Sequence, residues 1–267
     1  MARIGLAGCG RMGAPMLAAL CRAGFDARGF DLRPAAGFQG IPITNDPAAF
    51  AKGLKTLITV VRDADQTNDV LFGNQGFADA SQLETIIICS TLSPRYVRTL
   101  RGRVASHIAL IDAPMSGAAI AAQEARLSFM LGGAADDLDR AQPLFAAMGK
   151  HFHHMGGFGD GMTAKVLNNL LAASNTAMTR LVLDWADAQG IDEQRLLALI
   201  QTSSGQNWFA SGMATIEFAR DGHDPDNTIG ILVKDVAAAL DAAPDGADLT
   251  LPQTVQATIR SLRPRSV

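Results

Sequence analysis

Cysteine is scarce in this chain, which has three in 267 residues. Cys9, Cys21 and Cys89 form an odd set, and their spacing matches no zinc-binding pattern. A secreted fold stapled by disulfides is therefore excluded, and we expect buried thiols of a reducing compartment. Residues 1–3 lead directly into an apolar segment without the architecture of a signal peptide, so the cytoplasm is the expected location.

Long apolar runs and a strong excess of one charge are also missing. No stretch of 18 residues is both apolar and uncharged, so we expect no membrane partner. The chain has 23 basic and 26 acidic residues, and the net charge of −3 argues against nucleic-acid binding. With 48% hydrophobic and 18% charged residues, a disordered chain is excluded. The length is comfortable for two domains.

Short apolar runs alternate with helical patterns in the first half of the chain. Runs rich in Ile, Val, Leu and Thr are typical of buried parallel strands. Their alternation with helices predicts a doubly wound, mainly parallel α/β sheet of the Rossmann type. The predicted strands are residues 3–8, 26–31, 56–61, 85–90, 107–112 and 127–131, and the predicted helices include 14–23 and 64–72.

The second half predicts helices only. Residues 162–189 contain neither Gly nor Pro and are apolar nearly all round, which predicts one long buried helix connecting the two domains. Gly190 ends this helix and Asp192 can cap the next. We expect a dinucleotide-binding domain at 1–160 and a helical domain at 161–267. The glycine-rich segment 156–161 forms the boundary, and further helices are predicted at 193–202, 208–220, 231–241 and 251–262.

Gly8, Gly10 and Gly13 form a G-x-G-x-x-G motif between the first predicted strand and the first predicted helix. Such glycines allow a tight turn and close backbone approach, so that a pyrophosphate can lie at the helix N-terminus. Asp31 follows the second strand, where a carboxylate binds the adenosine ribose and repels a 2′-phosphate. Arg33 could instead bind that phosphate. NAD is therefore the expected cofactor, with NADP as the alternative.

Lys165 is one of only five lysines and lies in the first turn of the long predicted helix. Asn168 and Asn169 follow at i+3 and i+4, so the three side chains share one helix face. The helix dipole and apolar flanks such as Leu167 and Leu171, which we expect to be buried, favour the neutral amine that proton transfer requires. The alternative is a surface lysine with two polar neighbours.

Five motifs in order along the chain resemble those of the β-hydroxyacid dehydrogenases, a family that includes 3-hydroxyisobutyrate dehydrogenase and tartronate semialdehyde reductase. They are residues 5–16, 90–94, 112–117, 159–169 and the Lys-Asp pair 234–235. The resemblance covers nearly the whole chain. It implies hydride transfer between a nicotinamide and a small β-hydroxy acid or its semialdehyde.

The resemblance also implies roles for individual residues. Lys165 would be the general acid/base, and Asn169, with Asn168, would orient the substrate beside it. In oxidation neutral Lys165 accepts the hydroxyl proton as hydride leaves for NAD⁺, and in reduction its ammonium returns the proton. The implied cofactor-binding residues are Gly8, Gly10, Arg11, Met12, Gly13, Asp31, Leu32, Arg33, Val61, Thr91 and Lys234.

The implied substrate loop departs from the family's pattern. Ser116 and the amides of Gly117 and Ala118 would hold the substrate carboxylate. The family usually has glycine where Ala118, Ala121 and Ala125 stand, and a Thr is common in place of Arg126. We expect the methyl group of Ala118 to narrow the loop, so the identity of the acid stays open.

The histidines and tryptophans give weaker indications of function. His151, His153 and His154 cluster, but they lack acidic or Cys partners, so we expect no metal site. Trp185 and Trp208 are expected in the core rather than at the cofactor.

These observations favour an NAD(P)-dependent oxidoreductase with its active site in a cleft between a Rossmann domain and an all-helical domain, which opens and closes. Two alternatives remain. An imine reductase of the same fold is disfavoured by Lys165, and a non-catalytic dinucleotide-binding protein is disfavoured by Ser116, Lys165 and Asn169. We expect a homodimer or homotetramer.

Overall fold

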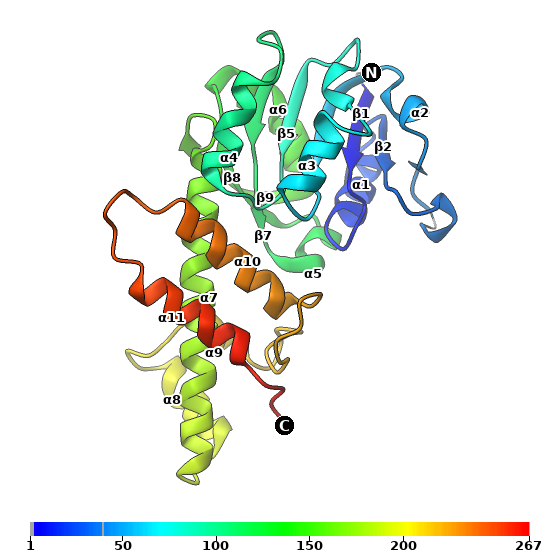
Figure 1. The fold of residues 1–267 in the computed structure, drawn as a ribbon. Coiled ribbons are helices and arrows are strands. Elements are labelled where there is room, and N and C mark those ends of the chain that lie inside the picture. The colour runs from blue at the N-terminus through cyan, green and yellow to red at the C-terminus, as the bar shows by residue number, and fades with distance from the viewer. Residues whose placement is uncertain (1–2, 39, 267) are drawn as a thin grey trace. The chain divides into compact units, whose positions relative to one another are not determined.

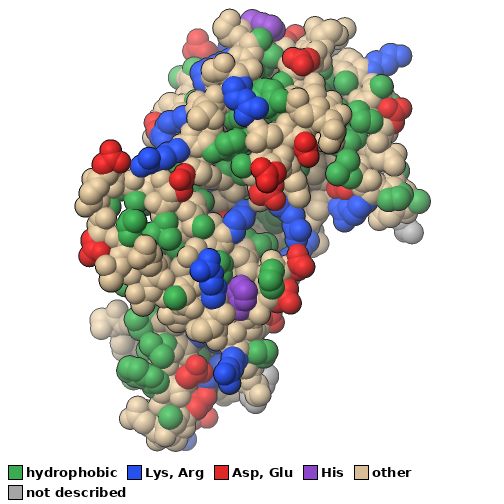
Figure 2. Space-filling view, viewed as in Figure 1, with side chains coloured by type: hydrophobic (Ala, Val, Ile, Leu, Met, Phe, Trp, Pro, Cys, Tyr) green, Lys and Arg blue, Asp and Glu red, His purple; other side chains and the backbone are tan. Residues whose placement is uncertain are grey.

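The computed structural model describes residues 3–38 and 40–266. The chain divides into two compact units, Met1–Lys165 and Val166–Val267, and the division falls within helix α7 (Asp160–Ala188) (Figure 1). Charged side chains of both signs are interspersed over the face seen in Figure 2, in keeping with the small net charge. Among the described residues, no helix has the length and apolarity needed to cross a bilayer.

A nine-stranded sheet forms the centre of the first unit (Figure 1). Its hydrogen-bonded path runs β3-β2-β1-β4-β5-β6-β8-β7, and β9 pairs with β8. The pairs from β3 through β6 are parallel, and their order is that of a Rossmann fold, as predicted. The strands are β1 (Arg3–Ala7), β2 (Ala27–Phe30), β3 (Ile43–Thr44), β4 (Leu54–Thr59), β5 (Thr85–Ile88), β6 (Ala109–Asp112), β7 (Met115–Ser116), β8 (Leu127–Gly132) and β9 (Gly149–Gly156).

The direction of β8 differs from the prediction. This strand runs antiparallel to β6 and β7, and it is parallel only to β9. A buried apolar run does not encode strand direction. The short β7 between β6 and β8 returns the chain in an antiparallel pair instead of a full crossover.

Helices cover both faces of the sheet, as a parallel sheet requires. The side chain of Ile87 in β5 belongs to one buried core, whereas those of Ile86 and Ile88 belong to the other, following the two-residue period of a strand. Helices α1, α5 and α6 contribute to the first core, and α2, α3 and α4 to the second. Their bounds are α1 (Gly13–Arg22), α2 (Pro47–Ala51), α3 (Ala64–Leu71), α4 (Pro94–Thr99), α5 (Ala118–Gln123) and α6 (Ala135–Met148), with 3₁₀ turns η1 (Ala35–Gly37), η2 (Phe77–Asp79) and η3 (Leu100–Gly102).

The second unit, as far as it is described, contains only helices, as predicted. Gly190 adopts φ +69° after α7, and the Asp192 carboxylate accepts the Arg195 N–H at 2.9 Å, which caps α8 as expected. The helices that follow α7 are α8 (Glu193–Gln201), α9 (Trp208–Ser211), α10 (Thr228–Asp241) and α11 (Thr250–Ser261).

Three expectations for the helical half are wrong. The helix predicted at 208–220 is limited to the four residues of α9, because Gly212 ends it. Helix α7 is not buried all round, since Met178 is 60% exposed and Trp185 is 62% exposed. Trp208 is also half-exposed rather than in the core. Apolar side chains are correspondingly visible at the surface of this unit in Figure 2.

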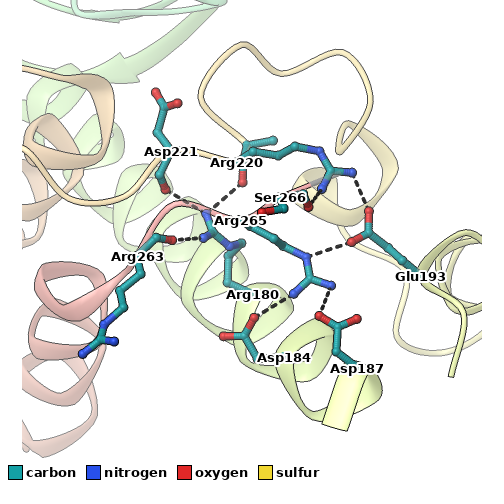
Figure 3. Close-up of polar contacts among 10 residues, drawn as sticks. Arg180, Asp184, Asp187, Glu193, Arg220, Asp221, Arg263, Arg265 and Ser266 are labelled. Carbon is teal, nitrogen blue, oxygen red and sulfur yellow. Dashed lines mark hydrogen bonds and ion pairs between the residues drawn. The ribbon is translucent and has the colours of Figure 1, made fainter. Parts of the chain in front are cut away.

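An arginine network ties the C-terminal segment to α7 and α8 (Figure 3). The Arg265 side chain is 8% exposed and forms ion pairs of 2.7 Å with Asp184 and with Asp187, both on α7. It pairs with Glu193 of α8 at 2.8 Å, and Glu193 also binds Arg220. Burial would raise the pKa of Glu193, but hydrogen bonds from both arginines outweigh burial and lower it. The Glu193 carboxylate therefore stays ionised. The C-terminal segment is held by the ion pairs of Arg265 with three carboxylates.

Arg180 forms the buried half of the same network (Figure 3). This side chain is 2% exposed, and burial lowers its pKa. Its Nη1 donates at 2.9 Å to the carbonyl oxygens of both Ala219 and Asp221, and its Nη2 donates to the carbonyl of Arg263. One guanidinium thus satisfies backbone acceptors from two separate segments of the second unit.

Candidate active site

The glycine-rich turn after β1 is shaped for close approach. Gly8 adopts φ +94°, and a Cβ there would lie 2.4 Å from the Val60 carbonyl oxygen. A Cβ on Gly13 would lie 1.9 Å from the Gly8 carbonyl oxygen. By contrast, nothing described lies within 4 Å of a Cβ placed on Gly10, so the space beside the turn is open. No side chain caps the start of α1. The Ala14 N–H bonds the Gly10 carbonyl at 3.1 Å and Pro15 has no N–H, so an anion here would use the Gly13 N–H and the positive end of the helix dipole.

The side chains next to the glycine-rich turn also suit the binding of an anion. Arg11 is exposed and Met12 is half-buried, directly before the start of α1. An exposed cation beside the positive end of a helix dipole suits a pyrophosphate. The predicted turn residues therefore lie together at one end of the sheet.

Asp31 lies directly beyond β2, and both of its carboxylate oxygens are engaged. It accepts the backbone N–H of Cys9 at 2.9 Å, and it accepts bonds of 2.9 Å from the Arg33 guanidinium. Burial would raise the pKa of Asp31, but the hydrogen bonds from Arg33 and Cys9 outweigh it and lower the pKa. Arg33 also stacks over the Phe38 ring at 4.8 Å. The cation that could bind a 2′-phosphate is therefore held by the carboxylate predicted to bind the ribose.

The remaining predicted cofactor residues of the first unit lie at the same edge of the sheet. Leu32 is 75% exposed just past β2, and Val61 follows β4, where its N–H donates to the Ser90 hydroxyl at 2.8 Å. Thr91 follows β5 and is half-buried. Because β1, β2, β4 and β5 are parallel, their carboxyl ends meet at one edge, which is where Rossmann sheets bind ligands.

The predicted substrate loop runs from β7 into α5. Ser116 ends β7 and is half-buried, while Gly117 adopts φ +136° and a Cβ there would lie 2.5 Å from the Cβ of Ala121. Ala118 starts α5 with φ +52°, a left-handed conformation that costs an L-residue free energy. Among the described residues, Ala125 is the only other non-glycine residue with positive φ, at +51°. Of the three positions at which the resemblance implies a family glycine, 118 and 125 thus keep a glycine-like backbone, whereas Ala121 is a buried residue inside α5 without a positive φ.

Replacing Ala125 with glycine is expected to raise the free energy of unfolding by about 0.5–1 kcal/mol. Ala125 follows α5 in a Schellman motif, in which the Arg126 N–H donates to the Ala121 carbonyl at 2.9 Å, and glycine is preferred at this position. Urea unfolding measures the effect. The control, Ala147→Gly within α6, should lower stability by about 1 kcal/mol. A lower free energy of unfolding in Ala125→Gly would contradict the inference that the positive φ of Ala125 is strained.

The start of α7 is held by Asp112, the last residue of β6. Its carboxylate is fully buried, and it accepts the backbone N–H of Gly159 at 2.6 Å and that of Met162. Burial raises the pKa of Asp112 to about 6, although the two N–H bonds oppose this. From the sequence, Asp112 was predicted only as part of the motif at 112–117. An acidic residue at the end of a buried strand was the signal for a structural role.

The glycine-rich segment 156–161 belongs to the first unit, and the division of the chain lies beyond it, after Lys165. Gly156 and Gly159 adopt φ of +135° and +98°. A Cβ on Gly161 would lie 2.5 Å from the Met130 carbonyl oxygen in β8. These glycines therefore provide close packing against the sheet.

Lys165 lies three residues after Met162 and is only 7% exposed. Its flanks are mixed, since Val166 is buried, but Leu167 and Leu171 are 58% and 64% exposed. The expectation that Leu167 and Leu171 are buried is therefore wrong. Burial of the amine comes from its own face of the helix, because residues one position apart point in different directions.

In the second unit, α7 carries both predicted asparagines. The Asn169 side chain is 8% exposed and donates to the Asp235 carboxylate of α10 at 2.6 Å. Asn168 donates to the Asn169 side-chain oxygen at 3.2 Å, and the Lys234 ammonium lies 3.8 Å from Asp235. Asp235, 3% exposed, is thus the residue that links the set. Its contact with Asn169 spans 66 residues, and no local pattern indicates it.

Comparison with known proteins identifies the family. Residues 3–157 match the NAD binding domain of 6-phosphogluconate dehydrogenase, and residues 159–264 match the NAD-binding domain of NADP-dependent 3-hydroxyisobutyrate dehydrogenase. L-threonate dehydrogenase of Cupriavidus necator is 31% identical over 248 residues, which cover 90% of this chain and 83% of that protein. The chain belongs to the β-hydroxyacid dehydrogenase family.

Two further β-hydroxyacid dehydrogenases match over most of their length. The 3-hydroxyisobutyrate dehydrogenase of Pseudomonas aeruginosa is 32% identical over 214 residues, or 78% of this chain and 72% of that protein. The structure of the Mycobacterium tuberculosis 3-hydroxyisobutyrate dehydrogenase with L-serine is 28% identical and has a TM-score of 0.80, covering 98% of this chain and 96% of the other. This β-hydroxyacid dehydrogenase is therefore a nicotinamide-dependent oxidoreductase, as predicted.

Proposed function

We propose that this β-hydroxyacid dehydrogenase interconverts a small β-hydroxy acid and its semialdehyde or keto form. The named relatives act on threonate and hydroxyisobutyrate, which share a short chain, a carboxylate and a nearby hydroxyl. The observation that carries the proposal is the burial of Lys165, 7% exposed in the first turn of α7. A buried amine is suited to proton transfer with an alcohol or carbonyl oxygen.

The proton-transferring group is Lys165. In oxidation its neutral amine accepts the proton from the substrate hydroxyl, and in reduction its ammonium returns it to the carbonyl oxygen. Asn169, whose amide is held by Asp235 and which accepts a bond from Asn168, orients the substrate. When bound, the nicotinamide supplies hydride acceptance and donation.

The substrate carboxylate would be held by the loop after β7. The Ser116 hydroxyl and the backbone N–H groups of Gly117 and Ala118 offer three donors in a short span, which suits an anion. The dinucleotide would lie at the carboxyl edge of the sheet, on the turn at Gly8, Gly10, Arg11, Met12 and Gly13 and beside Asp31, Leu32, Arg33, Val61 and Thr91. Lys234 would contact its nicotinamide side.

A panel of short hydroxy acids, including L-threonate, 3-hydroxyisobutyrate, L-serine and glycerate, tests this function with NAD⁺ and NADP⁺. Reduction of the cofactor by at least one acid, followed by nicotinamide absorbance, is the expected result. If no acid reduced either cofactor but a cyclic imine oxidised NADPH, the result would favour an imine reductase. Cofactor binding without any turnover would favour a non-catalytic binding protein.

Replacing Asp31 with alanine is expected to raise the ratio of kcat/KM with NADP⁺ to kcat/KM with NAD⁺ by about 10-fold or more. The change removes a ribose acceptor and a charge that repels the 2′-phosphate, and it releases Arg33 to bind that phosphate. Steady-state kinetics with both cofactors measure the ratio. In the double variant Asp31→Ala, Arg33→Ala the gain for NADP⁺ should disappear. An unchanged ratio in the single variant would contradict the role of Asp31.

The protein is further proposed to be a homodimer or homotetramer in the cytoplasm. Apolar side chains repeat along α7 at heptad-like spacing, a seam that a second copy could cover. Analytical ultracentrifugation tests this, and a monomer would contradict it. The cysteines are free, as in a reducing compartment, and cell fractionation would check the location. The exposed seam residues are Leu167, Leu171, Met178, Leu181 and Trp185.

A further inference from the structure

The first turn of a helix has N–H groups without intrahelical partners, and a neighbouring side chain usually caps them. Helix α7 is different, because its cap comes from Asp112, 47 residues before Gly159 and 50 before Met162. A cap of such long range does more than end the helix. It attaches the start of α7 to the carboxyl end of β6 in the first unit.

The surroundings leave this carboxylate little freedom. A Cβ on Gly132 of β8 would lie 2.2 Å from the Asp112 Oδ1 atom, and one on Gly161 would lie 2.9 Å from the Gly132 nitrogen. Glycine at both positions therefore lets β8, the carboxylate and the first turn of α7 pack in direct contact. Displacing the turn would require the backbone on both sides to move.

Other contacts to this turn are weaker. Arg98 of α4 binds Asp160 at 2.8 Å and Thr163 at 3.1 Å, but this ion pair is nearly half exposed. The Leu92 N–H points to the Met162 sulfur at 3.3 Å, and sulfur is a weak acceptor. Exposed ion pairs contribute little, whereas buried charge-assisted hydrogen bonds contribute more. Met162 is also fully buried in the second core of the first unit, which packs the turn against the sheet but satisfies none of its N–H groups. Among the polar contacts of the turn, the carboxylate is therefore the strongest.

We propose that Asp112 is a positioning residue for catalysis, which sets the location of Lys165 by holding the two backbone N–H groups of the preceding turn. The proposal rests on the role proposed above for Lys165. One residue of slippage in a helix rotates the side chain by roughly 100°, which would carry the amine away from the reacting oxygen. A displacement of about 1 Å can cost about 100-fold in rate.

Two substitutions at Asp112 test the proposal. Asp112→Asn keeps the size but places an amide NH₂ against one of the two N–H groups, and Asp112→Ala removes both acceptors. We expect kcat with the best hydroxy acid to fall about 10-fold in the first and about 100-fold in the second. The Kd for NADH and the KM for the acid should stay within about twofold, because neither the cofactor turn nor the substrate loop changes.

A matched control exists in the same unit. Asp46 also accepts two backbone N–H groups, from Ala48 at 2.9 Å and Ala49 at 3.3 Å, and so caps α2, which holds no catalytic residue. Asp46→Asn should leave kcat unchanged. Hydrogen exchange gives a second readout, since the amides of Gly159 and Met162 should be protected in the unaltered enzyme and should exchange at least about 10-fold faster in Asp112→Asn.

Wild-type kcat in Asp112→Asn would overturn the proposal, as would a parallel loss of NADH affinity, which indicates general damage to the first unit. Rapid exchange of both amides in the unaltered enzyme would also overturn it, so a failure of Asp112→Ala to fold leaves the test intact. The proposed function fails separately, if Lys165→Ala remains active. An inactive Lys165→Ala beside a fully active Asp112→Asn overturns the positioning role alone.

Discussion

Replacing Lys165 with alanine should lower kcat for the oxidation of a hydroxy acid by about 10³-fold, within the range of about 10²–10⁴-fold for a positioned acid or base. Without the amine, the proposed acceptor of the hydroxyl proton is missing as hydride leaves. The cofactor turn lies on other elements, so the Kd for NADH should change by less than about twofold. Stopped-flow or steady-state absorbance measures the rate, and fluorescence titration measures the Kd.

Three comparisons separate loss of the proton acceptor from loss of structure. Lys165→Arg keeps the positive charge but cannot release a proton near neutral pH, so it should be as slow as the alanine variant. A small primary amine added to Lys165→Ala should restore part of the rate, because it enters the space left by the side chain. The exposed Lys150→Ala on β9 should behave like the unaltered enzyme. Turnover of Lys165→Ala within about 10-fold of the unaltered enzyme would contradict the role.

The sheet could be predicted because each strand is a local apolar run with its own turn. The run at Thr85–Ile88 is an example, since every second side chain enters the same core. The direction of β8 could not be predicted, because it depends on how the chain returns through β7. The exposure of Trp185 was also missed. An apolar helix pattern does not say which of its faces the rest of the chain covers.

The candidate site likewise has parts that the sequence predicts and parts that it does not. The turn at Gly8 and the carboxylate of Asp31 follow adjacent strands, so spacing along the chain was enough to predict that they lie close together. The contacts of Asp112 and Asp235 join residues 47 to 66 positions apart. Their partners are backbone N–H groups in one case and an amide in the other, and neither leaves a periodic signal in the sequence.

The second large effect concerns stability rather than turnover. Arg180→Ala should lower the free energy of unfolding of the helical unit by about 3 kcal/mol or more. The substitution removes the hydrogen-bond donor from three backbone carbonyls, those of Ala219, Asp221 and Arg263. It also leaves a space where the guanidinium lay. A buried acceptor without a partner costs about 1–3 kcal/mol.

Tryptophan fluorescence during urea unfolding reports this change selectively, because the only two tryptophans, Trp185 and Trp208, both lie in the second unit. Arg180→Lys should be intermediate, since one ammonium keeps the charge but cannot reach all three carbonyls. The exposed Arg195→Ala on α8 removes the same side chain from the surface and should change stability by less than about 0.5 kcal/mol. If Arg180→Ala unfolded at the same urea concentration as Arg195→Ala, the guanidinium would not be what joins these segments.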